Sequence, residues 1–330
     1  MLDFVSRFHL PRNSFSRARA ALSVSVLTLT CAPGCRRVPC EIATQEKNPS
    51  AERTSAALAL VPPDAEIVLS LDFERLRSYP MWTTVFSALA KDMKPFFDGF
   101  AAGTGFDLTR QLHHVLIALP GERQGDDRFV LIADADRIDE ARVTAWLRAR
   151  LGGKAAVFVR DKSQIVISQG AWSDLMAPLV SASKPTPSAA DNPELRRLCA
   201  RAAGDHGLWF AAVVPGAVRR RLMQEARFPD VASIARVSGF VDLVGGAHAE
   251  LVAELSSTAD ATHLGHRLGV YLNQAKRHPE MLVYGLAPYF EGMRLSAHDA
   301  RVHATLDLSE AQLGEFIERI EALAHTTWTK

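Results

Sequence analysis

Three side chains that could bind a metal recur at helical spacing in the C-terminal part of the chain. Asp260, His263 and His266 follow one another at intervals of three residues, within a stretch from 259 to 276 that predicts an amphipathic helix. Residues three apart share one helix face, so a third ligand from another element would complete a metal site. Further histidines occur in neighbouring predicted elements: His248, His298 and His303.

The wider pattern around these histidines favours surface or helix-end positions over a catalytic metal. No glutamate stands where an H-E-x-x-H motif needs its general base, and no G-x-S-x-G turn occurs. The glycine-rich pieces lack the endings that phosphate-binding loops require. We therefore expect no catalytic residues, no metal and no cofactor. An envelope hydrolase or metalloenzyme of unrecognised type, using the His263/His266 region, stays as the alternative.

The densest basic run is Arg219-Arg220-Arg221, early in a predicted helix from 216 to 226. Such a run fits a contact with anionic lipid headgroups or an acidic partner, and the alternative is a solvated helix face. The whole chain has 38 Lys and Arg against 37 Asp and Glu, a formal net charge of +1. This balance argues against nucleic acid as a partner.

The first 34 residues have the order of a secretory signal. Residues 1–19 carry four arginines and one acid, and the short apolar run Ala20–Thr30 follows. Three cysteines come next, at Cys31, Cys35 and Cys40. They have no second close cysteine pair with which to build a zinc site, because the fourth cysteine, Cys199, is remote.

The segment Ala32-Pro33-Gly34-Cys35 places a small residue before a cysteine and resembles the signal peptides of bacterial lipoproteins. That resemblance implies that Cys35 accepts the lipid, with Cys31 as the alternative acceptor, and a plain cleaved signal is the competing interpretation. Residues 1–34 would then be the signal peptide. Residues 35–57 are mostly polar and predict a flexible tether.

The remainder predicts a body of two similar α+β halves, at 58–184 and 193–330, joined by a linker at 185–192 that is rich in Ser, Pro and Ala. Each half shows a strand, helical segments, hairpins and further helices, which predicts largely antiparallel sheets with helices packed on one face. The expected strands are 66–73, 114–119, 128–133, 155–159, 164–168, 208–214, 238–244, 249–255, 293–297 and 300–306. The expected helices are 80–97, with a disturbance at Pro95, and 138–151, 172–180, 216–226, 259–276 and 309–325.

From the signal through Pro62-Pro63-Asp64 to the repeated element order, the chain resembles predicted bacterial envelope lipoproteins of uncharacterised function. The resemblance implies a lipid anchor in a membrane and a body that faces the periplasm or the exterior. We expect a non-enzymatic binding or scaffolding role, with an unidentified protein or small-molecule ligand in the cleft between the halves.

The anchor is tested by substituting the acceptor. Several acyl chains hold a protein firmly on a membrane, so the intact chain should fractionate with membranes. Cys35→Ser should block processing or release the protein, and Cys31→Ser should do so instead if Cys31 is the acceptor. A doubly substituted chain that is still processed and membrane-bound in cell fractionation would contradict the lipid anchor.

Overall fold

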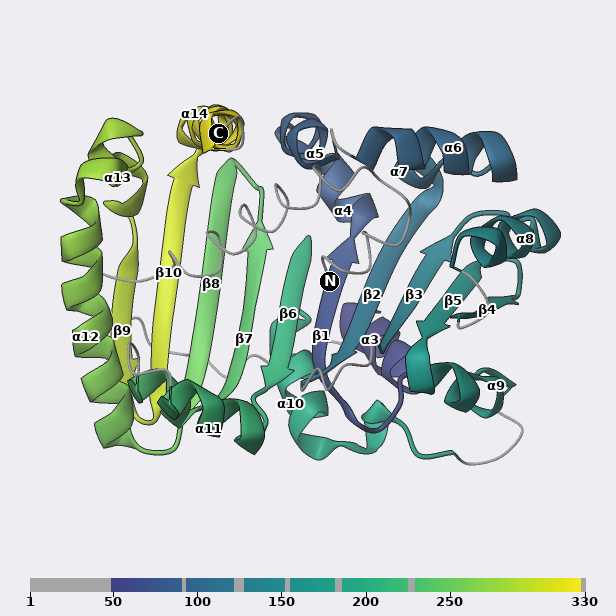
Figure 1. Cartoon of the computed structure of the whole chain (residues 1–330), viewed down its shortest axis with the longest axis horizontal. Helices are drawn as coiled ribbons and strands as arrows, with labels where there is room; N and C mark the ends of the chain where they lie inside the picture. The colour runs from purple at the N-terminus through teal and green to yellow at the C-terminus, as the bar shows by residue number, and fades with distance from the viewer. Residues whose placement is uncertain are drawn as a thin grey trace.

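A ten-stranded antiparallel sheet runs through the whole body, in the order β4-β5-β3-β2-β1-β6-β7-β8-β10-β9. The computed structural model describes residues 49–90, 93–121, 128–151, 155–181, 186–224 and 229–327. Helices lie along and beside the sheet (Figure 1). The α+β class expected from the sequence is confirmed.

The first half supplies one side of this sheet and the second half supplies the other. The first half comprises α3 (Pro49–Leu58), β1 (Ala65–Asp72), α4 (Phe73–Ser78), α5 (Trp82–Ala90), α6 (Lys94–Thr104), α7 (Leu108–Gln111), β2 (Leu112–Pro120), β3 (Phe129–Ala135), α8 (Glu140–Leu151), β4 (Ala155–Arg160), β5 (Gln164–Gln169), η2 (Gly170–Trp172) and α9 (Ser173–Ser181). The second half comprises η3 (Ala189–Asp191), α10 (Pro193–Ala202), β6 (Leu208–Val213), α11 (Gly216–Gln224), η4 (Pro229–Ser233), β7 (Ile234–Asp242), β8 (Gly246–Leu255), α12 (Thr258–Lys276), α13 (Pro279–Val283), η5 (Ala287–Phe290), β9 (Arg294–His298), β10 (Arg301–Ser309) and α14 (Glu310–Thr327).

The two halves have the same strand order when each is followed outward from the centre. The first half runs β1, β2, β3, β5, β4, and the second runs β6, β7, β8, β10, β9. The central strands β1 and β6 pair antiparallel, with Val68 opposite Ala211, so the halves share one sheet instead of forming two. A common origin by duplication stays a prediction.

The sheet has two faces with different coverings, which we name after one helix on each. The α10 face packs against α3, α9 and α10 over the first half and the central strands, around fully buried Val68, Leu116 and Trp209. The α12 face packs against α6 and α8 at one end and against α12 and α14 at the other. Helices therefore cover both faces of the first half, where one covered face was expected.

The expected tether at 35–57 does not extend to residue 57, because α3 begins at Pro49. Its buried side chains include Thr54, Ala57 and Leu58, which pack against the core and α10. The polar residues that suggested a tether lie among alanines that favour a helix. Residues 35–48, like the signal peptide at 1–34, lie outside the described residues.

The expected linker at 185–192 is packed against the body over its described part. Ala189 is fully buried, and its backbone N–H donates to the carbonyl of Val61 at 2.8 Å. Ser188 and Asp191 form a capping box around η3, and Asn192 then caps α10. The small polar residues that suggested a linker here act as helix caps.

The helix expected at 80–97 with a disturbance at Pro95 is two helices, α5 and α6. Pro95 lies in the first turn of α6, where a missing backbone N–H leaves no intrahelical hydrogen bond unmade. Gly99 and Gly103 lie inside α6, and the helix ends at Gly105, which has a φ of 74°. The expected start of the last helix is confirmed: Ser309 and Gln312 exchange hydrogen bonds as a capping box at 3.0 and 3.3 Å.

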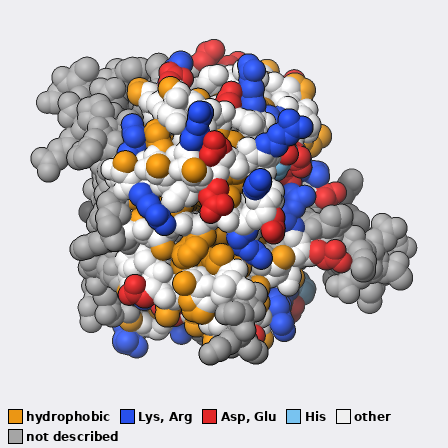
Figure 2. Space-filling model, turned by 90° about the vertical axis from the view of Figure 1, so that its right-hand side faces the viewer, with side chains coloured by type: hydrophobic (Ala, Val, Ile, Leu, Met, Phe, Trp, Pro, Cys, Tyr) orange, Lys and Arg blue, Asp and Glu red, His pale blue; other side chains and the backbone are white. Residues whose placement is uncertain are grey.

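The outer strand β4 ends the sheet in the first half. Figure 2 shows this end of the molecule, where basic and acidic side chains are interspersed and hydrophobic side chains gather near the middle of the view. Mixed charges of this kind give no strong single-sign field at this end, which matches the near-neutral composition.

Alanine substitutions at two glycines of α6 should have opposite effects on the free energy of unfolding. A Cβ at Gly103 would lie 2.2 Å from Cδ1 of Trp146, whose ring is held by a hydrogen bond to the carbonyl of Gly99 at 3.1 Å. Gly103→Ala should lower the free energy of unfolding by about 1–3 kcal/mol. Gly99→Ala has open space, with its nearest atom 4.0 Å away, and should raise it by up to about 1 kcal/mol. Urea denaturation measures both, and equal effects would contradict the packing described.

Candidate functional site

The histidines singled out in the sequence lie on opposite faces of the sheet. His263 and His266 are exposed on α12, and Asp260 accepts a hydrogen bond from Ser257 at the start of that helix. His248 and His303 lie on β8 and β10 with their side chains on the α10 face, since they pair with Asp307 and Val252 there. The sheet therefore separates the two groups.

A metal site of the kind considered from the sequence is not assembled among the described residues. No group of three or more His, Cys, Asp or Glu side chains there is arranged to hold a metal ion. His298 lies at the end of β9 beside Asp299, and Cys199 is buried in α10. Burial raises the pKa of the Cys199 thiol to about 12, so it stays protonated and is a poor metal ligand.

Of the other predicted contact residues, the cysteine lipid acceptors cannot be placed and the arginine run can. Cys35 and Cys31 lie outside the described residues. Arg219, Arg220 and Arg221 lie on α11, which directly follows β6. The Nε of Arg219 is buried without a hydrogen-bond partner in the structure. The arginine run is thus placed at the end of a central strand, and its ligand stays a prediction.

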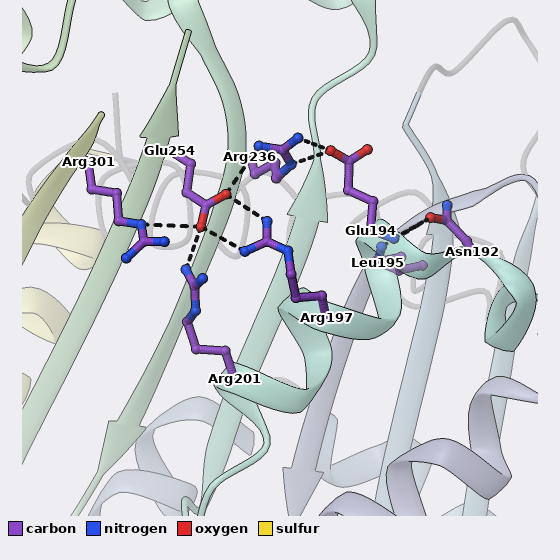
Figure 3. A network of polar contacts seen from close by, with 8 residues as sticks. All are labelled: Asn192, Glu194, Leu195, Arg197, Arg201, Arg236, Glu254 and Arg301. Carbon is purple, nitrogen blue, oxygen red and sulfur yellow. Dashed lines mark hydrogen bonds and ion pairs between the residues drawn. The ribbon is translucent and has the colours of Figure 1, made fainter. Parts of the chain in front are cut away.

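A buried carboxylate on the α10 face gathers four arginines. Glu254 on β8 has a side chain only 6% exposed, and both its oxygens are paired (Figure 3). Its contacts are Arg197 Nη2 at 2.9 Å, Arg201 Nη1 at 2.5 Å, Arg236 Nη1 at 3.2 Å and Arg301 Nε at 3.5 Å. Arg236 also pairs with Glu194. The cluster therefore joins α10 to β7, β8 and β10.

Helix periodicity explains how α10 supplies this cluster. Glu194, Arg197 and Arg201 follow at i, i+3 and i+7 and lie on one side of the helix. Leu195, Leu198, Cys199 and Ala202 occupy the other side and enter the core. Helix α10 was not among the helices expected from the sequence, although Asn192 followed by Pro193 is the start signal of a helix. The arginine spacing would have been visible once that helix was recognised.

The arginines set the protonation of Glu254. Burial alone would raise the pKa of this carboxyl, but hydrogen bonds and positive charges from Arg197 and Arg201 outweigh burial and hold the pKa at about 2. Four guanidinium groups face two carboxylates, Glu254 and Glu194, so the cluster carries an excess of positive charge.

Histidine and carboxylate pairs continue along the same polar face. His248 Nδ1 lies 2.6 Å from Asp307, and His303 Nδ1 lies 3.6 Å from Glu250. The hydrogen bond from His303 lowers the pKa of Glu250, and burial opposes that effect. These pairs bridge β8 and β10, so they are explained as cross-strand contacts.

Ser70, His114 and Asp134 have the order of a nucleophile, base and acid. Ser70 Oγ lies 2.7 Å from His114 Nε2, and His114 Nδ1 lies 3.4 Å from Asp134 Oδ2. The side chains come from β1, β2 and β3 on the α10 face. Ser70 is only 1% exposed, so a substrate does not reach it in this structure. The arrangement is explained as a polar contact within the core, in which His114 Nδ1 is buried without a hydrogen-bond partner.

The centre of the α12 face is apolar and only partly covered. Its side chains come from the four strands β1, β6, β7 and β8. Residues that are directly opposite each other on neighbouring strands point to the same face of the sheet. We call this set the central apolar strip: Ile67, Leu69, Leu208, Phe210, Ala212, Val237, Ala249 and Leu251.

The central apolar strip differs from the opposite side of the same strands. Val68, Trp209 and Ala211 on the α10 face are almost completely buried. Every member of the strip is partly exposed, and none belongs to a core cluster formed by the described residues. The strip lies between α6 and α8 on one side and α12 and α14 on the other (Figure 1). The strip is therefore a candidate binding surface.

The two central strands carry a sequence signal for this surface. Strand β6, LWFAAV, is apolar at every position, and β1, AEIVLSLD, carries the unbroken apolar run IVL, so neither strand alternates strictly between apolar and polar residues. Such strands belong at the centre of a sheet with both faces covered. Among the described residues, helices bury the α10 face of these strands and leave the central apolar strip on the α12 face partly exposed.

Comparison with known proteins adds little to this description. No protein-family model matches the sequence, and no curated protein matches it. A solved structure described as crystal form I of TP0453 aligns with 81% of this chain and 97% of its own, with a TM-score of 0.42 and 12% identity. That level of similarity transfers no function. Within the described residues, no helix has the length and apolar character needed to cross a membrane.

Acid titration tests the Glu254 cluster. A pKa of about 2, against 4.5 for an ordinary glutamate, means that ionised Glu254 stabilises the fold above pH 4.5 and loses this effect as the pH falls toward 2. Glu254→Gln should therefore cost about 3 kcal/mol of unfolding free energy at pH 7 and much less near pH 3. Denaturant unfolding at both pH values measures the difference, with the exposed Glu291→Gln as control. A pH-independent cost would contradict the assignment.

Proposed function

We propose that this chain is a non-enzymatic, lipid-anchored protein of the cell envelope whose body binds an amphipathic ligand with an acyl chain. The acyl chain lies on the central apolar strip, where the two halves meet. The single observation that carries the proposal is this partly exposed apolar surface in the middle of a ten-stranded sheet.

The chemistry of the strip favours an acyl chain as occupant. Seven of its eight side chains are aliphatic and the eighth is Phe210, so the surface offers dispersion contacts and no charged group. Each methylene group removed from water contributes about 0.8 kcal/mol. An aliphatic chain laid across four strands therefore gains affinity in proportion to its length.

The arginines of α11 supply a complementary charge for the ligand's other end. β6 contributes Leu208, Phe210 and Ala212 to the strip, and the chain then passes into α11. Ala212 is the last strip residue of β6, and Arg219 and Arg220 follow it within ten residues of sequence. An anionic headgroup at this end and an acyl chain along the strip would use both features. The buried, unpartnered Nε of Arg219 supports a polar ligand there.

An enzyme is the less supported alternative. His263 and His266 lie exposed on α12, without a third ligand among the described residues. The arrangement with hydrolase-like geometry found in the described part of the chain, at Ser70, is buried in the core. Neither observation favours catalysis, so the binding function is retained as the conclusion.

A series of fatty acids tests the acyl site. Octanoate, decanoate and dodecanoate should bind the full-length chain with affinity rising about fourfold per added methylene, until the strip is filled. The Cys31→Ser/Cys35→Ser form is used, so that no attached lipid competes. Isothermal titration calorimetry gives the affinities. Affinity that does not change with chain length would overturn the proposal.

Matched leucine substitutions locate the binding. Leu69→Gln places an amide in the strip and should weaken decanoate binding at least about tenfold. Leu175→Gln changes an exposed leucine of α9, outside the strip, and should leave binding unchanged. Thermal melts confirm that both variants fold. An equal loss of decanoate affinity in both variants would show that decanoate does not bind at the strip. A dimer that Leu69→Gln dissociates, in a chain that binds no fatty acid, would show that a second copy of the chain occupies the strip.

A further inference from the structure

We infer that the arginine cluster around Glu254 is a second binding site, which takes a small oxyanion such as a phosphate or carboxylate group. It lies on the α10 face, formed by Arg197, Arg201, Arg236 and Arg301 (Figure 3). The central apolar strip occupies the opposite face of the sheet. The inference therefore does not depend on the acyl-binding function.

The charge of the cluster is the first observation that points to an anion. Four guanidinium groups gather on one buried carboxylate, Glu254, and the second acid beside them, Glu194, pairs with Arg236 and also attracts Arg197. One or two arginines suffice to satisfy a carboxylate. The two remaining positive charges repel one another and are stabilised by an added anion.

Unused hydrogen-bond donors are the second observation. A guanidinium has five N–H donors, and Arg201 spends one on Glu254 at 2.5 Å. Arg301 reaches Glu254 only through an ion pair of 3.5 Å. Its side chain and that of Arg197 are each 45% exposed, so their outer donors face solvent. These donors are available to a ligand that approaches from outside.

Glu254 holds the guanidinium groups in position. Its side chain is 6% exposed and anchors arginines from α10, β7 and β10, which fixes groups that would otherwise move freely. Preorganised donors lose less conformational entropy when they bind an anion. Because Glu254 occupies the inner side of the cluster, the ligand contacts the outer side. That geometry fits a single phosphate or carboxylate group.

Binding of inorganic phosphate tests the site. Sodium phosphate is titrated into the full-length chain at constant ionic strength, with chloride as the balancing anion, and binding is followed by calorimetry and by thermal stabilisation. Arg301→Gln removes the most weakly held guanidinium and should weaken phosphate binding about tenfold. Arg294→Gln removes an exposed arginine on the same face of β9 and should leave it unchanged.

A charge-removing variant separates ligand binding from a purely structural role. Glu254→Gln keeps the shape of the side chain and an amide oxygen that still accepts hydrogen bonds from the arginines, so the groups stay gathered while one negative charge is lost. Phosphate should then replace that charge and raise the melting temperature more than in the unsubstituted chain. If the cluster is purely structural, phosphate should raise the melting temperature no more than chloride does, in the unsubstituted chain and in every variant. That result, or equal weakening in Arg301→Gln and Arg294→Gln, would overturn the inference.

Vesicles distinguish a headgroup from a free anion. Cosedimentation of the Cys31→Ser/Cys35→Ser form is compared between phosphatidylcholine vesicles and vesicles that also contain phosphatidic acid. Binding that requires phosphatidic acid and is lost in Arg301→Gln identifies a lipid headgroup as the source of the phosphate. Phosphate binding without such vesicle binding identifies a free anion. Both outcomes support the oxyanion site, and each names its ligand.

Discussion

The pairing of β1 with β6 is the constraint on which the rest of the structure depends. The two strands are antiparallel from Ile67 opposite Ala212 to Leu71 opposite Leu208, and the Asp72 amide extends the pairing with a 2.8 Å hydrogen bond to the carbonyl of Gly207. Without this pairing, each half would expose an edge strand with free backbone groups. With it, both halves share one sheet, and paired residues place their side chains on the same face.

The two faces of that sheet separate two chemistries. On the α10 face, helices seal the centre, and the strands of the second half carry charged pairs around Glu254. On the α12 face, helices pack at both ends and leave apolar side chains between them. An apolar ligand and a small anion would therefore be held on opposite sides of the same strands. The strands that join the halves are also those that form the apolar site.

Much of the fold could be predicted from the sequence because local patterns determine it. The strand at 208–213, the helix at 258–276 and the capping box at Ser309 followed from apolar periodicity and cap chemistry. The helix α3 and the packed segment at η3 could not, since Thr54 and Ala189 are buried through contacts with distant residues. The Glu254 cluster needs four arginines from three elements, which only the sheet order brings together.

Methyl-resolved NMR of the full-length chain with bound decanoate tests the central claim most directly. If the acyl chain lies where the halves meet, its methylene protons should show intermolecular nuclear Overhauser effects to the methyl groups of Ile67, Leu69 and Leu251. These residues come from β1 and β8 and share the α12 face. Effects confined to exposed methyl groups elsewhere, such as those of Leu175 and Val283, would contradict the account.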